Sequence, residues 1–442
     1  MALKPGNAEP RLSMERKEAK LGLGVPRISP GYKQTEVGVI PEDWSIVSAF
    51  DACSKIQDGT HFSPRIGGND YFYITSKNIR FGHLDISTAS RIDRVQHQAI
   101  YRRCDVKKGD LLLTKDGANT GNAALNTLDE EFSLLSSVAF LRFHPSQYCP
   151  AYFLQQVLTS QGQRQIQDAM AGNAITRLTL EKIKKLRFPV PPTKAEQEAI
   201  AKLLSDADAL IESLEQLIAK KRQIKQGAML ELLTGKRRLP GFDGEWKNCP
   251  LRECLLADPD YGLNAPGVPQ TGSLPTYLRI TDIDDDGRFI PSGRVAVNHP
   301  FSMNYRLGEN EIVFARTGAS VGKTYLYNAD DGEVVFAGFL IRAKIDCSKL
   351  CPYFLAAFTK TERYWNWVRV MSMRSGQPGI NGNEYADLTL HLPPTIEEQT
   401  AIATILSDMD AEIAALEAKL AKARQIKQGM MQELLTGKIR LV

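Results

Sequence analysis

Cysteine and histidine are scarce in this sequence, with seven cysteines and six histidines in 442 residues. The closest cysteine pairs are Cys249 with Cys254 and Cys347 with Cys351. Neither pair has the two-residue gap of a zinc knuckle, and the histidines do not cluster beside them. We therefore predict no metal site.

Long apolar runs are also missing. No segment approaches the roughly 18 consecutive apolar residues that a membrane span needs. The N-terminal stretch MALKPGNAEPRLSMERKEAK lacks the basic-then-apolar order of a secretory signal, so we expect residues 1–31 to form a flexible leader. The sequence predicts a cytoplasmic protein without membrane contact.

A complete nucleotide-binding loop is the third absence. The stretch TGASVGKT at 317–324 is similar to one, but three residues separate Gly318 from Gly322 where that loop needs four, and the matching stretch DGANTGNA at 116–123 has no lysine. Both stretches keep their glycines. This pattern indicates a turn between strands in which glycine supplies a positive φ.

Catalytic constellations are not evident either. There is no glycine-rich cofactor loop between a strand and a helix, and no spaced cluster of carboxylates with lysine that would suit a nuclease. The two PP pairs are followed by Thr193 and Thr395, whereas an aminomethyltransferase would be expected to place an aromatic residue there beside a flipped base. We predict no catalytic residue and no cofactor in this chain.

The chain does contain an internal duplication. A shift of 202 residues aligns 191–239 with 393–441 without a gap, with 33 of 49 positions identical, and RQIKQG occurs in both copies. A chain of 442 residues exceeds the usual size of one domain, so two or more domains are expected. The formal charge of +4 is compatible with nucleic-acid binding but does not indicate it alone.

Each duplicated stretch predicts one long helix. Its start is marked by PPT, where Thr193 and Thr395 can form capping boxes with Glu196 and Glu398. Its end is marked by the glycine of the repeated ELLTG. The interval of about 40 residues corresponds to roughly 60 Å of unbroken helix.

Apolar residues recur along both helices in alternate steps of four and three, which is the spacing of a coiled-coil seam. These residues are Ile200, Leu204, Ala207, Ile211, Leu214 and Ile218, and Ile402, Leu406, Met409, Ile413, Leu416 and Leu420. Because the seams are nearly alike, we expect antiparallel packing about an internal pseudo-two-fold axis. The basic residues should then face outward, toward solvent, a protein partner or phosphates. They are Lys220, Arg222, Lys225, Lys422, Arg424 and Lys427.

Two less similar segments, roughly 44–190 and 246–392, lie outside the helices. Trp44 matches Trp246, and Cys149-Pro150 matches Cys351-Pro352, at the same shift of 202. Short runs of Val, Ile, Phe and Tyr, punctuated by Gly, Asp and Asn, predict β-rich domains with loops. We expect a shared fold with different surfaces.

Polar and cationic loop residues form the candidate binding site, because such side chains contact phosphates and base edges. In the first segment they are Thr60, His61, Arg65, Lys77, Asn78, Lys115, Asn119 and Arg177. In the second they are Tyr261, Arg279, Arg316, Ser320, Lys323, Arg374 and Gln377. A solvated loop side chain is the simpler interpretation of any one of them, so only the set indicates binding.

The order of these parts resembles the specificity subunits of type I restriction-modification systems. The resemblance rests on two variable β-rich domains that alternate with two near-identical helices, each opening with PPTxxEQ and closing with ELLTGK, and on YKQTEVGVIPEDW at 32–44. It covers the chain from about Lys33 onward.

The resemblance implies an α+β fold with an internal pseudo-two-fold duplication. Target recognition domains would occupy 32–190 and 240–392, and spacer helices packed as an antiparallel coiled coil would occupy 191–239 and 393–442. Each recognition domain would read one half of a bipartite, asymmetric double-stranded DNA site. The helices would set the spacer between the halves and dock the modification subunits.

The resemblance also implies partners that supply the chemistry. Two modification subunits would bring S-adenosylmethionine and methylate an adenine in each half-site, and two restriction subunits would add translocation and cleavage that require ATP and Mg. The residues leave two alternatives open. One is a two-headed DNA-binding scaffold or regulator of another defence system, and the other is a nucleotide-dependent DNA enzyme that uses 317–324.

Overall fold

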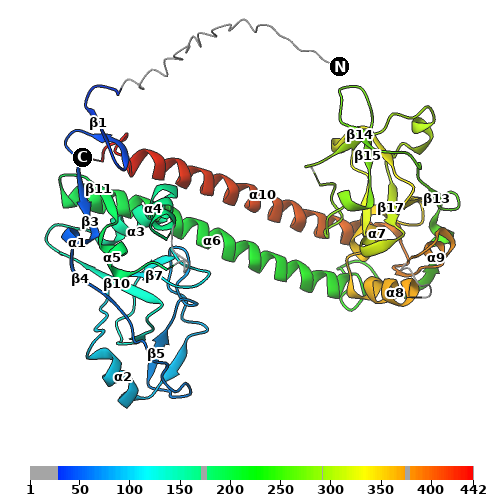
Figure 1. Ribbon diagram of the computed structural model, residues 1–442. Helices are drawn as coiled ribbons and strands as arrows, with labels where there is room; N and C mark the ends of the chain where they lie inside the picture. The colour runs from blue at the N-terminus through cyan, green and yellow to red at the C-terminus, as the bar shows by residue number, and fades with distance from the viewer. Residues whose placement is uncertain (1–27, 171–176, 291, 374–378, 442) are drawn as a thin grey trace, which may run out of the picture. The chain divides into compact units, whose positions relative to one another are not determined.

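The computed structural model describes residues 28–170, 177–290, 292–373 and 379–441 (Figure 1). Unit 1 comprises residues 1–209 and 424–442, and unit 2 comprises residues 210–423. The division passes through two long helices, α6 (Lys194–Leu232) and α10 (Ile396–Leu434), so each helix contributes to both units. Within the described residues, no helix combines the length and apolar content that crossing a membrane requires.

The larger sheet of unit 1 has four antiparallel strands in the order β4-β10-β7-β8. They are β4 (Cys53–Asp58), β10 (Val138–Phe143), β7 (Leu111–Thr114) and β8 (Ala123–Leu125). The smaller sheet, in the order β6-β5-β9, consists of β6 (Ser90–Ile92), β5 (Tyr71–Ile74) and β9 (Ser133–Leu134). All four residues of β7 are buried, which explains why its sequence LLLT does not alternate with polar residues.

Shorter elements surround these sheets. β1 (Tyr32–Thr35) and β2 (Gly38–Pro41) form a hairpin, and β3 (Ser45–Ser48) pairs with β11 (Arg187–Val190). The helices are α1 (Ala49–Ala52), α2 (Arg94–Tyr101), α3 (Pro150–Leu158), α4 (Ser160–Met170) and α5 (Leu180–Lys184). The main core joins Leu111, Leu141 and Phe153 to Ile200 and Leu204, so the first turns of α6 belong to the core of unit 1.

Unit 2 repeats this plan. Its antiparallel sheet, in the order β13-β20-β17-β18, consists of β13 (Asp260–Tyr261), β20 (Leu340–Lys344), β17 (Glu311–Ala315) and β18 (Thr324–Leu326). The second sheet, in the order β14-β16-β15-β19, consists of β14 (Val268–Pro269), β16 (Val295–Ala296), β15 (Thr276–Leu278) and β19 (Val334–Phe336). β12 (Lys247–Pro250) pairs with β21 (Thr389–Leu392), and the α-helices are α7 (Pro352–Phe358), α8 (Glu362–Ser372) and α9 (Gly382–Ala386).

The described residues of unit 2 also form five 3-10 helices: Leu251–Cys254, Ile280–Asp282, Ser302–Tyr305, Gly318–Ser320 and Ala329–Asp331. One of them, Ser302–Tyr305, stands where unit 1 has α2, and β14 is an additional strand. The predicted α+β duplication is therefore confirmed. The two units differ in these elements and in the β1–β2 hairpin, which has no matching strand pair among the described residues of unit 2.

The long helices begin and end near the predicted residues. The Glu196 amide donates to Thr193 Oγ1 at 3.2 Å, and the Glu398 amide donates to Thr395 Oγ1 at 3.3 Å. After each helix, the glycine of ELLTG adopts a positive φ, 70° at residue 235 and 72° at residue 437. The predicted caps and stops are confirmed.

The second half of the predicted capping box is wrong. The carboxylates of Glu196 and Glu398 are buried and do not turn back to the cap. In unit 1, Glu196 accepts from Arg440 at 2.6 and 2.8 Å, and in unit 2, Glu398 accepts from Arg238 at 2.6 and 2.8 Å. A buried carboxylate needs a charged, hydrogen-bonding partner, and an arginine fork satisfies both of its oxygens.

The seam between the helices is shorter than predicted. In unit 2, Ile211, Leu214 and Ile218 of α6 pack with Leu416, Leu420 and Ala423 of α10. Ile200 and Leu204 of α6 instead join the core of unit 1, and Ile402 and Leu406 of α10 join the core of unit 2. Ion pairs in unit 2 link Arg222 to Glu417 and Lys225 to Asp410. The residue of α6 that comes later in the sequence is thus paired with the residue of α10 that comes earlier. This register confirms the antiparallel pairing.

These ion pairs correct one expectation about the basic residues. Arg222 and Lys225 do not simply face outward, because they bridge to α10 in unit 2, and Lys427 bridges to Asp208 in unit 1 at 2.5 Å. Opposite charges beside an apolar seam are a common means of fixing helix register. Lys220, Lys422 and Arg424 are exposed, as predicted.

The repeated EQ dipeptide also has a structural role. Gln197 Oε1 accepts from the Cys149 amide at 2.9 Å, and its Nε2 donates to the Gln147 carbonyl at 3.2 Å. In unit 2, Gln399 makes the same two bonds to Cys351 and Lys349, at 2.9 and 3.1 Å. The first turn of each long helix is thereby attached to the segment that opens α3 or α7.

Candidate nucleic-acid interface

Loops from separate parts of the sequence meet at one end of the larger sheet in unit 1. We call residues 58–62, 75–80, 115–121, 135–137 and 177–178 the unit 1 loop cluster. The Ser136 amide donates to the Thr60 carbonyl at 2.8 Å, and the Leu178 amide donates to the Lys115 carbonyl at 3.1 Å. Asn119 Nδ2 donates to the Ser76 carbonyl at 3.4 Å. Backbone and amide bonds therefore hold these loops together.

Lys115 lies at the centre of the unit 1 loop cluster. Its side chain is only 4% exposed, and Nζ lies 3.2 Å from both Asp58 Oδ2 and Asp116 Oδ2. Asp116 also accepts from Arg177, with Nε at 2.7 Å and Nη2 at 3.1 Å, and these bonds raise the pKa of the Arg177 guanidinium. His61 Nε2 lies 3.5 Å from Asp58 Oδ2. The cluster is a network of paired charges with exposed tips.

Unit 2 builds the corresponding surface from matching segments. We call residues 260–263, 279–284, 316–322, 337–339 and 379–380 the unit 2 loop cluster. The Gly338 amide donates to the Leu263 carbonyl at 2.7 Å, and the Ile380 amide donates to the Arg316 carbonyl at 2.9 Å, as the Leu178 amide does to Lys115 in unit 1. The backbone framework is thus repeated.

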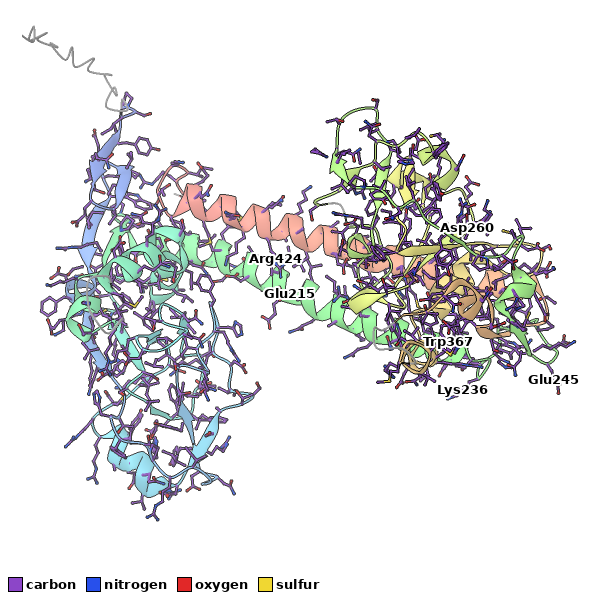
Figure 2. All side chains as sticks on the ribbon, turned by 45° about the vertical axis from the view of Figure 1, so that its right-hand side comes forward. Glu215, Lys236, Glu245, Asp260, Trp367 and Arg424 are labelled. Carbon is purple, nitrogen blue, oxygen red and sulfur yellow. The ribbon has the colours of Figure 1, made fainter. Side chains whose placement is uncertain are left out.

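The side chains at the centre of this framework differ. The Arg316 guanidinium stands over the Tyr261 ring at 4.9 Å from its centroid, where unit 1 has the Lys115–Asp58 pair. The Tyr261 hydroxyl accepts from the Gly382 amide at 3.1 Å. Asp260, labelled in Figure 2, accepts from Arg342 Nη2 at 2.6 Å and anchors the strand that presents Tyr261. An aromatic face stabilises a cation here in place of a carboxylate.

A glycine makes the close approach of segments possible in each cluster. A Cβ at Gly59 would lie 1.9 Å from the Leu134 carbonyl oxygen, and a Cβ at Gly262 would lie 2.2 Å from that of Ala337. No residue with a side chain fits either place. The loops that present Thr60 and Tyr261 are therefore fixed by the same backbone crossing.

The other predicted residues fall into several groups. Thr60, His61, Asn119 and Ser320 lie in the loop clusters, and Lys77 is exposed within one of them, whereas Arg65 is exposed just beyond it. Asn78 is buried and holds its own turn, accepting from the Thr75 amide at 3.0 Å, so its side chain is not presented to a ligand. Arg374 and Gln377 lie outside the described residues.

Two predicted cations of unit 2 are paired with acidic neighbours. Arg279 donates to Asp282 at 2.8 and 2.6 Å, and these bonds raise the pKa of the guanidinium. Lys323 Nζ lies 2.8 Å from Asp285 Oδ1, which lowers the pKa of that carboxyl. A ligand would have to displace these carboxylates.

Sequence reasoning missed several residues of the clusters. Asp58 and Asp116 position the cations but read as ordinary loop acids. Phe62 and Phe339, which also belong to the clusters, are 54% and 56% exposed. A phenylalanine inside the polar stretch DGTHFSPR was a usable signal for Phe62, whereas Phe339 lies in FAGFLIR, which reads as a buried strand.

The stretch 317–324 is the turn between β17 and β18. Gly318 and Gly322 have φ of 70° and 89°, and the matching Gly117 and Gly121 have φ of 95° and 96°. The prediction of turns with positive-φ glycines is confirmed. A Cβ at Gly322 would also lie 2.7 Å from Val368, so this turn is packed against α8.

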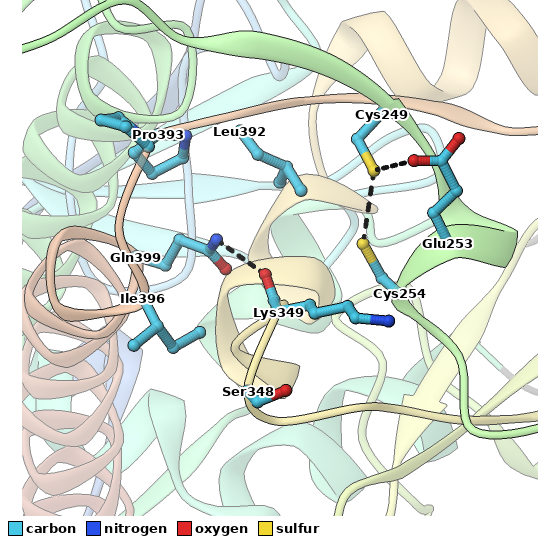
Figure 3. Close-up of a pocket in the computed structure, with 10 residues that line it drawn as sticks. Cys249, Glu253, Cys254, Ser348, Lys349, Leu392, Pro393, Ile396 and Gln399 are labelled. Carbon is cyan, nitrogen blue, oxygen red and sulfur yellow. Dashed lines mark hydrogen bonds between the residues drawn. The ribbon is translucent and has the colours of Figure 1, made fainter.

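A pocket of about 590 Å³ in unit 2 is lined by two cysteines, among other residues (Figure 3). Cys249 Sγ lies 3.6 Å from Cys254 Sγ, and Gln399 borders the same space. Burial raises the pKa of Cys254 to about 12, so its thiol stays protonated and unreactive at neutral pH. Within the described residues, no group of three potential ligand side chains could hold a metal ion. This pocket is therefore a weaker candidate for a functional site than the loop clusters.

Comparison with known proteins decides the family. The model of the type I restriction modification DNA specificity domain matches residues 41–223 and 295–425. The chain belongs to this family. The resemblance seen in the sequence is thereby confirmed, and the chain is a DNA-recognition subunit of a type I restriction-modification system, not an enzyme by itself.

Sequence matches to other type I specificity subunits cover nearly the whole length of this chain. The specificity subunit of the type I restriction enzyme MjaVIII from Methanocaldococcus jannaschii is 22% identical over 428 residues, covering 91% of this chain and 94% of the relative. A provisionally named MjaX specificity subunit from the same organism is 24% identical over 447 residues, covering 93% and 97%.

A solved structure supports the fold of this specificity subunit. The type I S subunit from M. genitalium superposes with a TM-score of 0.61 at 16% identity and covers 88% of this chain and 96% of its own. The likeness in fold at such low identity agrees with a duplicated framework whose surfaces vary.

Proposed function

We propose that unit 1 and unit 2 each read one half of a bipartite, asymmetric site in double-stranded DNA through their loop clusters. The observation that carries this proposal is the pairing of a repeated backbone framework with unlike central side chains, Lys115 with Asp58 in unit 1 and Arg316 with Tyr261 in unit 2. Equal frameworks suit a common ligand, and unlike side chains suit different base sequences.

The chemistry of the loop tips supports DNA as the ligand. Arg177 and Arg316 can make bidentate contacts to guanine, and Asn119 can pair with adenine. Asp116 holds Arg177 in place until DNA binds, because a phosphate or a guanine edge can replace a carboxylate as acceptor. The exposed rings of Phe62 and Phe339 can stack on or wedge between bases.

We propose further that α6 and α10 act as a spacer and as the docking surface for two modification subunits. Those subunits would carry S-adenosylmethionine and methylate an adenine in each half-site, and two restriction subunits would carry ATP and Mg. The seam and ion pairs between α6 and α10 support a stiff connection, and the exposed Lys220 and Lys422 leave charge available to a partner.

The first experiment is single-molecule sequencing for N6-methyladenine in cells that carry this gene and its modification subunit. We expect a bipartite motif that disappears when only this gene is deleted. Unchanged methylation, with the modification subunit active, would contradict a sequence-directing role.

A second experiment assigns half-sites to units. Exchange of residues 44–190 for the matching segment of a relative should change one half-site only. Insertion of one heptad into each long helix should lengthen the gap between half-sites and leave both unchanged. If both half-sites change after the exchange, the assignment of one unit to one half-site is wrong.

A further inference from the structure

An exposed ion pair lies beside the unit 2 loop cluster. Lys323 Nζ lies 2.8 Å from Asp285 Oδ1, and the side chain of Asp285 is 96% exposed. Lys323 directly follows the segment 316–322 of the cluster, and Asp285 directly follows the segment 279–284. A hydrogen-bond donor and an acceptor therefore stand side by side at the edge of the surface that we assign to DNA.

The local fold does not account for Asp285. Two neighbouring aspartates hold the turn: Asp282 Oδ2 accepts from the Arg279 amide at 2.9 Å, and Asp284 Oδ1 accepts from two amides of the same turn at 2.9 and 2.8 Å. Within the described residues, the carboxylate of Asp285 pairs with Lys323 alone. An exposed pair of this kind adds little to stability. Its charges are therefore available to a ligand.

Unit 1 has the same framework without the ion pair. Asn122 Nδ2 donates to the Ile79 carbonyl at 3.1 Å, just as Lys323 Nζ donates to the Ile283 carbonyl at 3.3 Å. The residues after Ile79 are RFGH, without a carboxylate, whereas the residues after Ile283 are DDDGR. An uncharged amide is thus enough to make this contact, so the charges of unit 2 need another explanation.

The donor and the acceptor of this pair complement one G·C base pair. In the major groove, guanine presents the acceptors O6 and N7, and cytosine presents the donor N4. Because O6 and N4 are hydrogen-bonded to each other, they lie about 2.9 Å apart. This separation is close to the 2.8 Å between Lys323 Nζ and Asp285 Oδ1. The lysine can donate to guanine and the aspartate can accept from cytosine while the two side chains stay paired.

Both side chains are in the protonation and bonding state that this contact requires. The hydrogen bond from Lys323 lowers the pKa of the Asp285 carboxyl, so the group is ionised at neutral pH and can only accept. Lys323 uses two of its three N–H groups within the described residues, on Asp285 and on the Ile283 carbonyl. One N–H group remains for a base.

An A·T pair also presents a donor beside an acceptor, but it fits this ion pair less well. Thymine O4 is a single acceptor with the C5 methyl group beside it, whereas guanine places N7 next to O6. The remaining N–H group of Lys323 can be shared between these two guanine atoms. The ion pair therefore favours G·C over A·T.

We propose that Lys323 and Asp285 together read one G·C pair in the half-site of unit 2, with Lys323 on guanine and Asp285 on cytosine. This inference rests on the proposed function, because it assigns one base pair to one of the two half-sites. A reversed base pair would place a donor against the ammonium and an acceptor against the carboxylate. The ion pair thus rejects the wrong base pair as well as binding the right one.

The test uses the complex of the full chain with its modification subunit and a duplex that carries the methylated motif. The half-site of unit 2 is the one that the exchange of residues 44–190 leaves unchanged. Initial methylation rates are measured on duplexes with each single base-pair change in that half-site. We expect the wild type to require a G·C pair, and Asp285→Ala and Lys323→Ala each to reduce discrimination at that same position about tenfold.

Two further variants control for charge and for structure. Lys349→Gln removes an ion pair with Asp346 that lies beyond β20 and outside the loop cluster, so discrimination should be unchanged at every position. The exchange of Lys323→Asp with Asp285→Lys keeps the opposite charges and reverses the order of donor and acceptor. This exchange should change the preferred base pair at that position from G·C to C·G.

Several results would overturn the assignment. One is a half-site of unit 2 that contains no G·C pair, and another is a pair of alanine variants that lose discrimination at different positions or at none. An equal loss of methylation on every duplex would show that the ion pair is only structural. Absence of any bipartite motif in the wild type would instead contradict the proposed function.

Discussion

The Lys115–Asp58 pair of unit 1 and the Arg316–Tyr261 pair of unit 2 stand at the same place in equivalent sheets. In the first, a nearly buried ammonium is fixed by two carboxylates, and in the second a guanidinium lies on an aromatic face. The backbone bonds that bring the loops together are the same. The comparison teaches that the framework of this fold tolerates a complete change of chemistry at its centre, which a pair of different recognition surfaces requires.

The largest loss of stability should follow from removal of the buried arginine–glutamate pair that both units share. Arg238→Ala leaves the fully buried Glu398 of unit 2 without its partner, and Arg440→Ala does the same to Glu196 of unit 1. Loss of one member of a buried ion pair costs about 3 kcal/mol or more. Hydrogen exchange of peptides from each unit should show loss of protection in the unit that carries the change.

Matched controls exist one or two residues away. Arg237 and Lys438 are exposed and form surface pairs with Glu231 and Glu433, so their replacement by alanine should cost less than about 1 kcal/mol. Equal effects of the control and test variants would show that the buried pairs are not what holds the helix ends.

The next largest loss of stability should come from the glutamine that makes the same two hydrogen bonds in each unit. Gln197→Ala in unit 1 and Gln399→Ala in unit 2 each leave a buried amide and a carbonyl without partners, at a cost of about 1–3 kcal/mol. The two variants should destabilise their own units similarly in urea. Gln216→Ala, on the exposed side of α6, should have no measurable effect.

Much of this shared part was predictable. The positions of α6 and α10, their caps and their stops follow from PPT, the apolar spacing and ELLTG. The partners of Glu196 and Gln197 were not predictable, because Arg440 and Cys149 are 244 and 48 residues away and only the folded chain brings them together. The capping-box interpretation of Glu196 failed because an arginine is a stronger partner for a buried carboxylate than a backbone amide.

The loop clusters were predictable only in part. The glycine turns follow from the repeated spacing of glycines. The burial of Asn78 and the pairing of Lys115 were not visible, since a polar residue in a loop can hold its own turn or face a ligand with the same sequence signature. The set of loops was identified, but the residues at their tips could not be separated from those that hold them.

Replacement of an arginine in a loop cluster should have a smaller effect than the changes above, and the effect should be confined to one half-site. Arg177→Gln should reduce methylation of one half-site, and Arg316→Gln should reduce methylation of the other. Each variant should lose about 1–3 kcal/mol of discrimination between the correct and the wrong base in its own half-site. Methylation kinetics on duplexes with single base changes would measure this. Lys108→Gln, an exposed pair with Asp129, serves as the control in unit 1. A loss at both half-sites from either arginine variant would break the assignment of one unit to one half-site.

The smallest effect concerns the pocket of Figure 3. The positions that match Cys249 and Cys254 in unit 1 are Val47 and Ala52, so the thiols act as small apolar side chains, and Cys249→Val with Cys254→Ala should change stability by less than about 1 kcal/mol at pH 7. Burial raises the pKa of Cys254 from 9.0 to about 12. Its contribution is therefore complete below pH 9 and is lost as the pH rises through 12. The free energy of unfolding should fall less between pH 8 and pH 11 in the double variant than in the wild type, as measured by denaturation at the two pH values.

The attachment of Arg440 to Glu196 has a consequence for synthesis. Unit 1 contains the first 209 residues and the last 19, from 424 to 442, whereas unit 2 is one continuous stretch. Domains commonly fold in order as the ribosome releases them. Here unit 1 must wait until residues 424–441 have been synthesised to receive the last turns of α10, so of the two units the one that begins first is completed second.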